Sequence, residues 1–277
     1  MITLPTGAGN PGLAAPGEAV YLVTWAYDLA PANRDAMRVT VHPCRETPPT
    51  VPPAADEVHV WVVNLGSPAG DPADLAACLT PEERDRAARY KFGPVREQFV
   101  ATRGTLRRLL GGYLGVAPHA VPITYGASGK PALVGHPLHF NVTHTTGLAL
   151  VAVGRSRVGV DVERVRAVPD AAGLVGRFFS PAEREAYRAL PEESRAAAFY
   201  RGWVCKEAVI KAAGASVQYL DGFDVELDPA RPPAVLAVHH PVLAGGGWLV
   251  ADWEPAAGYA AAVAAEGTGE VRIIPAH

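Results

Sequence analysis

Acidic side chains stand inside two apolar segments, and this pattern limits how the chain can fold. The segment WVCKEAVIKAAG has the composition of a helix on which Trp203, Glu207 and Lys211 recur every four residues and share a face. The segment VGVDVE predicts a strand on which Asp161 and Glu163 point the same way. Because buried carboxylates need partners, we expect the helix face and the strand face to meet.

Contact between these two faces would bring the carboxylates of Asp161, Glu163 and Glu207 close to Lys206 and Lys211. Carboxylate oxygens are preferred ligands of Mg²⁺ and lysines neutralise phosphate charge, so the cluster predicts a metal-dependent site for phosphate or pyrophosphate. Each piece also has an ordinary explanation. Glu207 and Lys211 have the spacing of a surface ion pair, and Asp161 and Glu163 can form the solvent face of an edge strand. The apolar neighbours of both segments favour the metal site.

Composition narrows the function classes. With 277 residues and 49% hydrophobic content, the chain can form one large domain or two ordinary ones. A net charge of −3 argues against a dedicated nucleic-acid-binding protein. The three cysteines are far apart and lack CxxC spacing, which predicts neither a disulfide framework nor a zinc site. Without a long apolar run or a basic leader, we expect a cytoplasmic protein that does not enter the membrane.

Proline content and helix signals divide the chain. Residues 1–55 are rich in proline, which disfavours a continuous helix or a central strand, so we expect an extension outside the catalytic core. Thr80 and Ser180 each precede a proline and stand three residues before a glutamate, the pattern of a capped helix start. Long helices are predicted to follow both, ending at Gly115 and Gly214.

These signals predict an α+β fold of two similar lobes, an N-terminal lobe over residues 56–154 and a C-terminal lobe over residues 155–277. Each lobe would carry helices packed on a small, mostly antiparallel sheet, with a pseudo-twofold relation between them and the active site at their junction. The last strands are expected to form one antiparallel set: FDVEL, GGWLVADWE, YAAAVAAE and EVRII.

Five ordered motifs resemble those of a known family. GKP, FNVTH, GVDVE, FFSPAERE and W-x-x-K-E-A-x-x-K together resemble the 4′-phosphopantetheinyl transferase superfamily, in its larger, pseudo-dimeric (Sfp-like) type. The resemblance covers about Thr80 to Asp228. It implies transfer of phosphopantetheine from coenzyme A to a serine of an acyl or peptidyl carrier protein, with release of adenosine 3′,5′-bisphosphate.

The resemblance also implies roles for individual residues. Asp161, Glu163 and Glu207 match the acidic positions that hold Mg²⁺, for which Mn²⁺ can substitute. The positions that match contacts to coenzyme A, the co-substrate, are Lys130, Thr143, His144, Lys206 and Lys211, with Arg86 and Arg103 as further candidates.

The chemistry follows from the residues themselves. Attack of a serine hydroxyl on a phosphoanhydride needs charge neutralisation and a base that takes the serine proton. Glu207 is the candidate base, Lys211 the group that stabilises the departing phosphate, and Asp161 the third catalytic residue.

The resemblance implies an acidic carrier protein as the partner. It also implies that the enzyme is a monomer. Cations far outnumber carboxylates over Arg84–Arg108, so this region is either a solvated helix pair or a docking surface, with Phe178, Phe179 and Tyr200 as apolar contacts. Fatty-acid, polyketide, nonribosomal-peptide and siderophore pathways all remain open, and the resemblance favours secondary metabolism.

Three other functions compete with this interpretation. A regulatory module that binds coenzyme A without turnover would not need a complete set of acidic positions. Another Mg²⁺-dependent phosphotransferase is expected to show a GxxxxGK[ST] loop or a nucleophilic aspartate motif, and the sequence has neither. A nucleic-acid-binding protein would be unusual with an acidic net charge and no reading motif.

Overall fold

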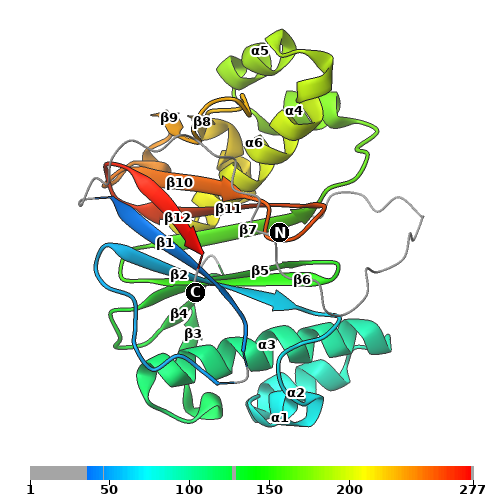
Figure 1. Cartoon of the computed structure of the whole chain (residues 1–277), viewed down its shortest axis with the longest axis vertical. Helices are drawn as coiled ribbons and strands as arrows, with labels where there is room; N and C mark the ends of the chain where they lie inside the picture. Colours follow the sequence, from blue (N-terminus) through cyan, green and yellow to red (C-terminus); the bar gives the residue numbers. More distant parts are fainter. Residues whose placement is uncertain (1–35, 46, 127–128, 276–277) are drawn as a thin grey trace.

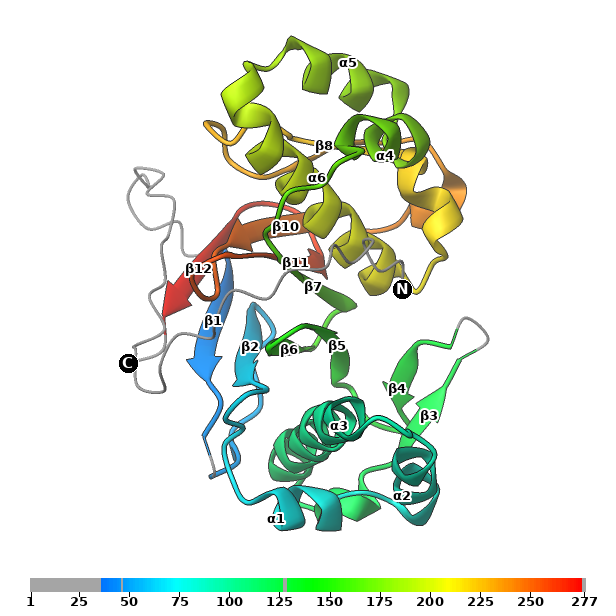
Figure 2. The ribbon, with the colours of Figure 1, turned by 90° about the vertical axis from the view of Figure 1, so that its right-hand side faces the viewer.

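The computed structural model describes residues 36–45, 47–126 and 129–275, so the first 35 residues of the predicted extension lie outside it. The described chain has the predicted α+β fold and forms four layers (Figures 1 and 2). In order they are helix α3 (Gly93–Leu114), a five-stranded sheet, a three-stranded sheet and helix α6 (Glu192–Ala213). No helix in the described ranges is long and apolar enough to cross a membrane.

The five-stranded sheet forms the N-terminal lobe together with α3. In spatial order its strands are β12 (Val271–Pro275), β1 (Met37–Pro43), β2 (Glu57–Asn64), β6 (Leu148–Gly154) and β5 (His139–Thr145). Strands β2, β6 and β5 are antiparallel neighbours, whereas β1 runs parallel to both β2 and β12.

The position of β1 corrects the expectation that residues 1–55 hold no central strand. This strand lies between two hydrogen-bonded partners, and its Val39 and Val41 are buried. The run from Met37 to His42 contains no proline, and Pro43 stands only at its end. The high proline content of residues 1–55 as a whole therefore did not apply to the short run that forms β1.

The predicted lobe boundaries also do not follow the sheets. Strand β12 was expected to close the antiparallel set of the C-terminal lobe, but it pairs in parallel with β1 in the sheet of the N-terminal lobe. The FDVEL segment likewise leaves that set. It forms β8 (Phe223–Val225), which pairs with β9 (Val235–Val238) in a separate hairpin.

The three-stranded sheet is antiparallel, as predicted. Its strands are β10 (Trp248–Trp253), β11 (Tyr259–Glu266) and β7 (Val158–Arg164). The valines at 158, 160 and 162 pack between the two sheets, so the alternate residues of β7 face α6. A further hairpin, β3 (Ile123–Tyr125) and β4 (Pro131–Leu133), flanks the N-terminal lobe.

The helices repeat between the lobes. A short helix, α2 (Pro81–Ala88) or α5 (Pro181–Ala189), precedes a long helix of 22 residues, α3 or α6. Capping boxes at Thr80 and Ser180 start both short helices, and left-handed Gly115 and Gly214 end both long ones, which confirms the four predicted signals. Two short helices, α1 (Pro72–Ala77) and α4 (Ala171–Phe178), had not been predicted.

Candidate active site

Asp161 lies in the middle of β7 on the face toward α6, and only 5% of its side chain is exposed. Glu207 and Lys211, one turn apart on α6, lie beside it. The Lys211 Nζ is 2.5 Å from Asp161 Oδ1 and 4.0 Å from Glu207 Oε2. From β5, the Thr143 hydroxyl donates to Asp161 Oδ1 at 3.1 Å and accepts from Lys211 Nζ at 3.2 Å. These four residues, here called the Asp161 cluster, come from elements of both lobes.

Two oxygens of the Asp161 cluster remain open. Asp161 Oδ2 and Glu207 Oε1 are buried and have no hydrogen-bond partner among the described residues. A buried carboxylate oxygen without a partner is unfavourable, and oxygens of this kind are ligands of hard divalent cations, so these two oxygens are of the chemical type that Mg²⁺ prefers. Within the described ranges, no group of three or more His, Cys, Asp or Glu residues is arranged to hold a metal ion. Here the positive charge beside Asp161 is the Lys211 ammonium.

Burial shapes the proton affinity of the other two carboxylates. Glu163 lies two residues beyond Asp161 on the same face of β7. Burial raises the pKa of Glu163 to about 7, and repulsion by Asp161 adds to the effect. Burial also raises the pKa of Glu207, while the nearby Lys211 opposes the shift. A carboxylate with raised proton affinity is suited to accept a proton near neutral pH.

His144 and Lys130 are the other predicted coenzyme A contacts that come from the N-terminal lobe. His144 follows Thr143 on β5 and is exposed, and desolvation by the surrounding protein lowers its pKa, with the Lys211 charge as a smaller cause. The Lys130 Nζ donates to the carbonyl oxygens of Val158, at 3.2 Å, and Ala212, at 2.8 Å. Burial lowers the pKa of Lys130 to about 8. Lys130 thus lies at the joint between β7 and α6.

The structure does not bring Lys206 to the cluster, which corrects its predicted contact with coenzyme A. Its side chain is 1% exposed and points into the core, where the ammonium donates to both oxygens of Glu183 and to the carbonyl of Phe223, each at 2.7 Å. An ammonium has three donors, so none remains for a phosphate. Sequence spacing placed Lys206 beside Glu207 but did not show that its side chain turns away from β7, toward α5 and β8.

Arg86 and Arg103 also lie apart from the cluster. The Arg103 guanidinium contacts Glu83, at 2.5 Å, and the hydroxyl of Tyr125, at 2.7 Å. Arg86 is exposed on α2 and lies over the ring of Phe99, 5.3 Å from its centroid. These contacts hold both arginines within the N-terminal lobe.

The predicted docking surface is smaller than the sequence suggested. Arg107 is buried against Glu83, and Arg108 donates to the carbonyl of Ala69 at 2.6 Å. Phe179 and Tyr200 are buried, which excludes them as surface contacts and corrects that prediction. The exposed cations of the region are Arg84, Arg86, Arg89, Lys91 and Arg96.

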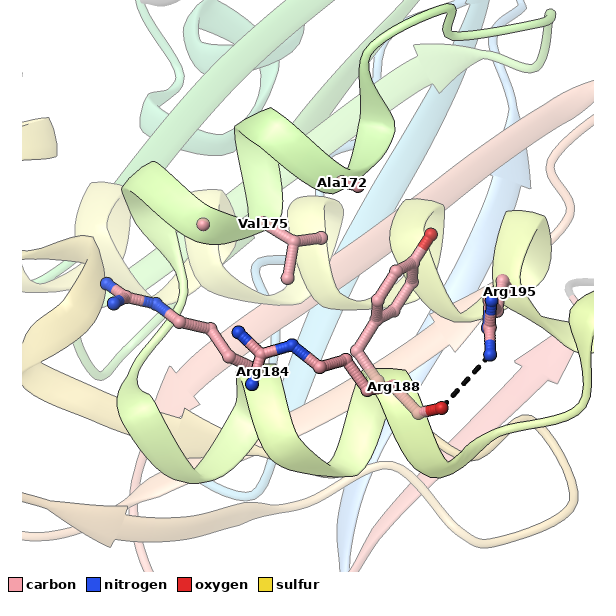
Figure 3. Close-up of a pocket in the computed structure, with 7 residues that line it drawn as sticks. Ala172, Val175, Arg184, Arg188 and Arg195 are labelled. Carbon is pink, nitrogen blue, oxygen red and sulfur yellow. Dashed lines mark hydrogen bonds between the residues drawn. The ribbon is translucent and has the colours of Figure 1, made fainter.

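A second basic surface was not anticipated. Between α4, α5 and α6 lies a cavity of about 120 Å³ lined by Arg184, Arg188 and Arg195 around the apolar Val175 and Tyr187 (Figure 3). Arg184 donates to the backbone carbonyl of Phe179 at 2.8 Å, and Arg195 donates to that of Leu190 at 3.1 Å. The spacing of Arg184 and Arg188 along the predicted helix was the available signal, but nothing in the sequence indicated that a third arginine would join them.

Comparison with known proteins identifies the family. Residues 157–264 match the model of the 4′-phosphopantetheinyl transferase superfamily. The 4′-phosphopantetheinyl transferase HetI of Nostoc sp. (strain PCC 7120) is 39% identical over 227 residues, which cover 80% of this chain and 93% of the relative. The chain belongs to this superfamily. The predicted resemblance is confirmed, and the protein is a transferase.

Two further relatives support the same family. The 4′-phosphopantetheinyl transferase of Bacillus subtilis is 27% identical over 161 residues, covering 57% of this transferase and 71% of the relative. The 4′-phosphopantetheinyl transferase AcpT of Escherichia coli (strain K12) is 33% identical over 151 residues, covering 54% and 72%. The family match spans all of β7 and α6, the elements that carry Asp161, Glu207 and Lys211.

Proposed function

We propose that this transferase moves the 4′-phosphopantetheine group of coenzyme A to a serine hydroxyl of an apo acyl or peptidyl carrier protein. The reaction would depend on Mg²⁺ and release adenosine 3′,5′-bisphosphate. The observation that carries the proposal is the Asp161 cluster, in which two open, buried carboxylate oxygens lie beside a lysine. Phosphoryl transfer needs this combination of metal ligands and a cation for the phosphate oxygens.

The proposed metal ligands are Asp161, Glu163 and Glu207. Asp161 and Glu207 supply the open oxygens, and Glu163 lies on the same face of β7. A bound Mg²⁺ would neutralise charge on the pyrophosphate of coenzyme A. Mn²⁺ also accepts carboxylate oxygens, so it should support the reaction.

The reacting groups of the chain would be Glu207 and Lys211. Glu207 would accept the proton of the carrier serine, for which its raised pKa is favourable. Lys211 would stabilise the phosphate of the departing adenosine 3′,5′-bisphosphate, because its ammonium already lies between the two buried carboxylates. Asp161 would orient Lys211 through the ion pair that joins β7 to α6.

The nucleotide end of coenzyme A would bind toward the N-terminal lobe. Thr143 on β5 belongs to the cluster, His144 follows it in the strand, and Lys130 directly precedes β4. To bind the 3′-phosphate, Lys130 would exchange its two backbone carbonyl partners for phosphate oxygens. The proposed contacts to coenzyme A are therefore Lys130, Thr143, His144 and Lys211, and Lys206 is not one of them.

We further propose that the enzyme acts as a cytoplasmic monomer on carrier proteins with acidic surfaces. Two basic regions are suited to such a partner by charge: the exposed cations of α2 and the start of α3, and the arginines of the α4–α5 cavity. Polyketide and nonribosomal-peptide carriers are the proposed substrates.

The test is an assay of phosphopantetheine transfer, applied to the unsubstituted protein, to a Glu207 variant and to a matched control variant. The protein is incubated with coenzyme A, Mg²⁺ and a panel of apo carrier proteins, and mass spectrometry records the gain of phosphopantetheine. Glu207→Gln should remove most transfer, by about 100-fold or more, because it removes the base and the negative charge of a proposed metal ligand. Glu193→Gln, which removes an exposed charge from the first turn of the same helix, should keep normal transfer.

Two results would contradict the proposal. Normal transfer by a correctly folded Glu207→Gln variant would exclude the role of Glu207. If the unsubstituted protein modified no carrier in the panel yet bound coenzyme A, the regulatory interpretation would replace the enzymatic one.

A further inference from the structure

The two lobes meet at a seam between β5 and β7. Strand β5 is the edge of the five-stranded sheet and β7 is the edge of the three-stranded sheet, and the two pack against each other without a backbone ladder (Figure 2). An edge strand carries backbone N–H groups that need partners when they are buried. The seam must satisfy them in another way.

Asn141 supplies one such bond. It lies on β5, and its side-chain Oδ1 accepts a hydrogen bond from the backbone N–H of Val160 on β7 at 2.9 Å. Both residues are buried, with 6% of Asn141 and none of Val160 exposed. Because water cannot replace this acceptor at a buried position, loss of the Asn141 oxygen would leave the Val160 amide without a partner.

The same two strands carry the contacts of the active site. Thr143 stands two residues beyond Asn141 on β5, and Asp161 directly follows Val160 on β7. The Thr143 hydroxyl bonds to Asp161, which also holds Lys211. Side-chain bonds from alternate residues of β5 therefore fix consecutive residues of β7, and the bond from Asn141 sets the position from which Asp161 reaches Thr143 and Lys211.

We propose that Asn141 is a positioning residue for phosphopantetheine transfer. It acts through the backbone of β7, holding Asp161 against Thr143 and Lys211 and so fixing the position of the open Asp161 oxygen. The inference rests on the proposed function for its link to transfer. The contact between Asn141 and Val160 can be tested without any assay of transfer.

The central experiment replaces Asn141 with leucine, which keeps the size of the side chain but removes the acceptor. Hydrogen exchange followed by NMR should show the Val160 amide exchanging about 10-fold faster or more, relative to the amides of the β2–β6 ladder, as expected for an amide that loses its buried partner. Titration calorimetry with Mn²⁺ alone should show about 10-fold weaker binding, the usual effect of losing a group that orients a metal ligand. The kcat/KM for carrier modification should fall together with the Mn²⁺ affinity.

Two variants separate positioning from general destabilisation. Leu110→Ala opens a cavity in the core between α3 and the five-stranded sheet. This core lies on the face of the sheet opposite β7, so the variant should lower stability without a selective effect on Val160 or on Mn²⁺ affinity. Asn141→Asp keeps an acceptor oxygen and should retain the protection of Val160. It also replaces leucine as the test variant if Asn141→Leu does not fold.

The outcomes distinguish the inference from the proposed function. If Asn141→Leu loses protection at Val160 no more than Leu110→Ala does, or if both variants bind Mn²⁺ equally, the positioning role is wrong. If Asn141→Asp is the test variant, the Val160 amide should stay protected from exchange. Faster exchange at Val160 in that variant would likewise refute the positioning role. Absence of transfer by the unsubstituted protein would refute the proposed function while leaving the result at Val160 valid.

Discussion

Replacement of Gly159 by alanine would test how the site is held together. Gly159 lies two residues before Asp161, at the point where β7 touches α6. A Cβ atom there would lie 2.1 Å from the carbonyl oxygen of Ala208 and 2.4 Å from the backbone nitrogen of Ala212. Ordinary contacts begin at 3.4 Å, so the strand and the helix would have to separate by about 1 Å. Both obstacles are backbone atoms, which cannot rotate away.

The expected magnitudes follow from this separation. Inserting a methyl group into a closely packed core costs about 1–3 kcal/mol, and the loss of unfolded-state entropy on replacing glycine returns at most about 1 kcal/mol. A shift of about 1 Å between Asp161 and Lys211 would change the ion pair on which the site depends, and displacements of this size cost about 100-fold in rate. We therefore expect Gly159→Ala to lower both the free energy of unfolding and kcat/KM.

The assay measures denaturant unfolding and carrier modification on the same preparations. Gly176→Ala is the matched control, because Gly176 lies inside α4 and a Cβ there would have no atom within 4 Å. This control should keep a normal kcat and gain about 0.5–1 kcal/mol of stability from the better helix former. Unchanged stability and unchanged kcat/KM in Gly159→Ala would refute the close packing. Lower stability with normal kcat/KM would refute its link to the site.

Two further predictions concern charge. Lys211→Met should lower the melting temperature in EDTA because the buried carboxylates lose their cation, and thermal unfolding should show that Mg²⁺ stabilises this variant more than the unsubstituted protein. Burial lowers the pKa of His42 to about 4, so the unfolded chain binds a proton that the folded protein excludes, and stability should fall as the pH drops from about 6.5 toward 4. Because His42 is partly exposed, its share of this slope should stay below about 1.4 kcal/mol per pH unit, and urea unfolding between pH 4.5 and 7.5 should show a flatter profile for His42→Phe.

Local signals in the sequence predicted the helices well. The capping boxes at Thr80 and Ser180 and the terminal glycines at 115 and 214 depend only on neighbouring residues, so they could be read directly. The convergence of Asp161 with the α6 face was also predictable, because a carboxylate in a buried strand needs a partner and α6 offers one.

Long-range pairing could not be predicted in the same way. The parallel contact of β12 with β1 joins segments from opposite ends of the described chain, and neither segment encodes its partner. The Asn141 bond was missed for a related reason. The sequence shows an asparagine within a predicted strand. Its role can be recognised only once β7 is known to lie beside β5 without backbone hydrogen bonds between the two strands.

Comparison of the two lobes explains why Lys206 was assigned incorrectly. In the C-terminal lobe, Glu183 closes the capping box of α5 and also binds Lys206 from the following long helix. In the N-terminal lobe, Glu83 closes the capping box of α2 and binds Arg107 from α3. Both cations stand 14 residues after the first residue of their helix and both are buried. The pair therefore belongs to the repeated framework.

The same comparison separates the residues of the site from those of the framework. Counted from the starts of their helices, Glu207 and Lys211 of α6 correspond to Arg108 and Gly112 of α3, so the N-terminal lobe has no carboxylate or lysine at these positions. Gly112 instead lies against the carbonyl of Pro49, where a Cβ atom would be only 2.3 Å away, so no larger side chain fits there without displacing the backbone. The repeated fold positions both long helices, and only α6 carries the acid and the lysine at the seam.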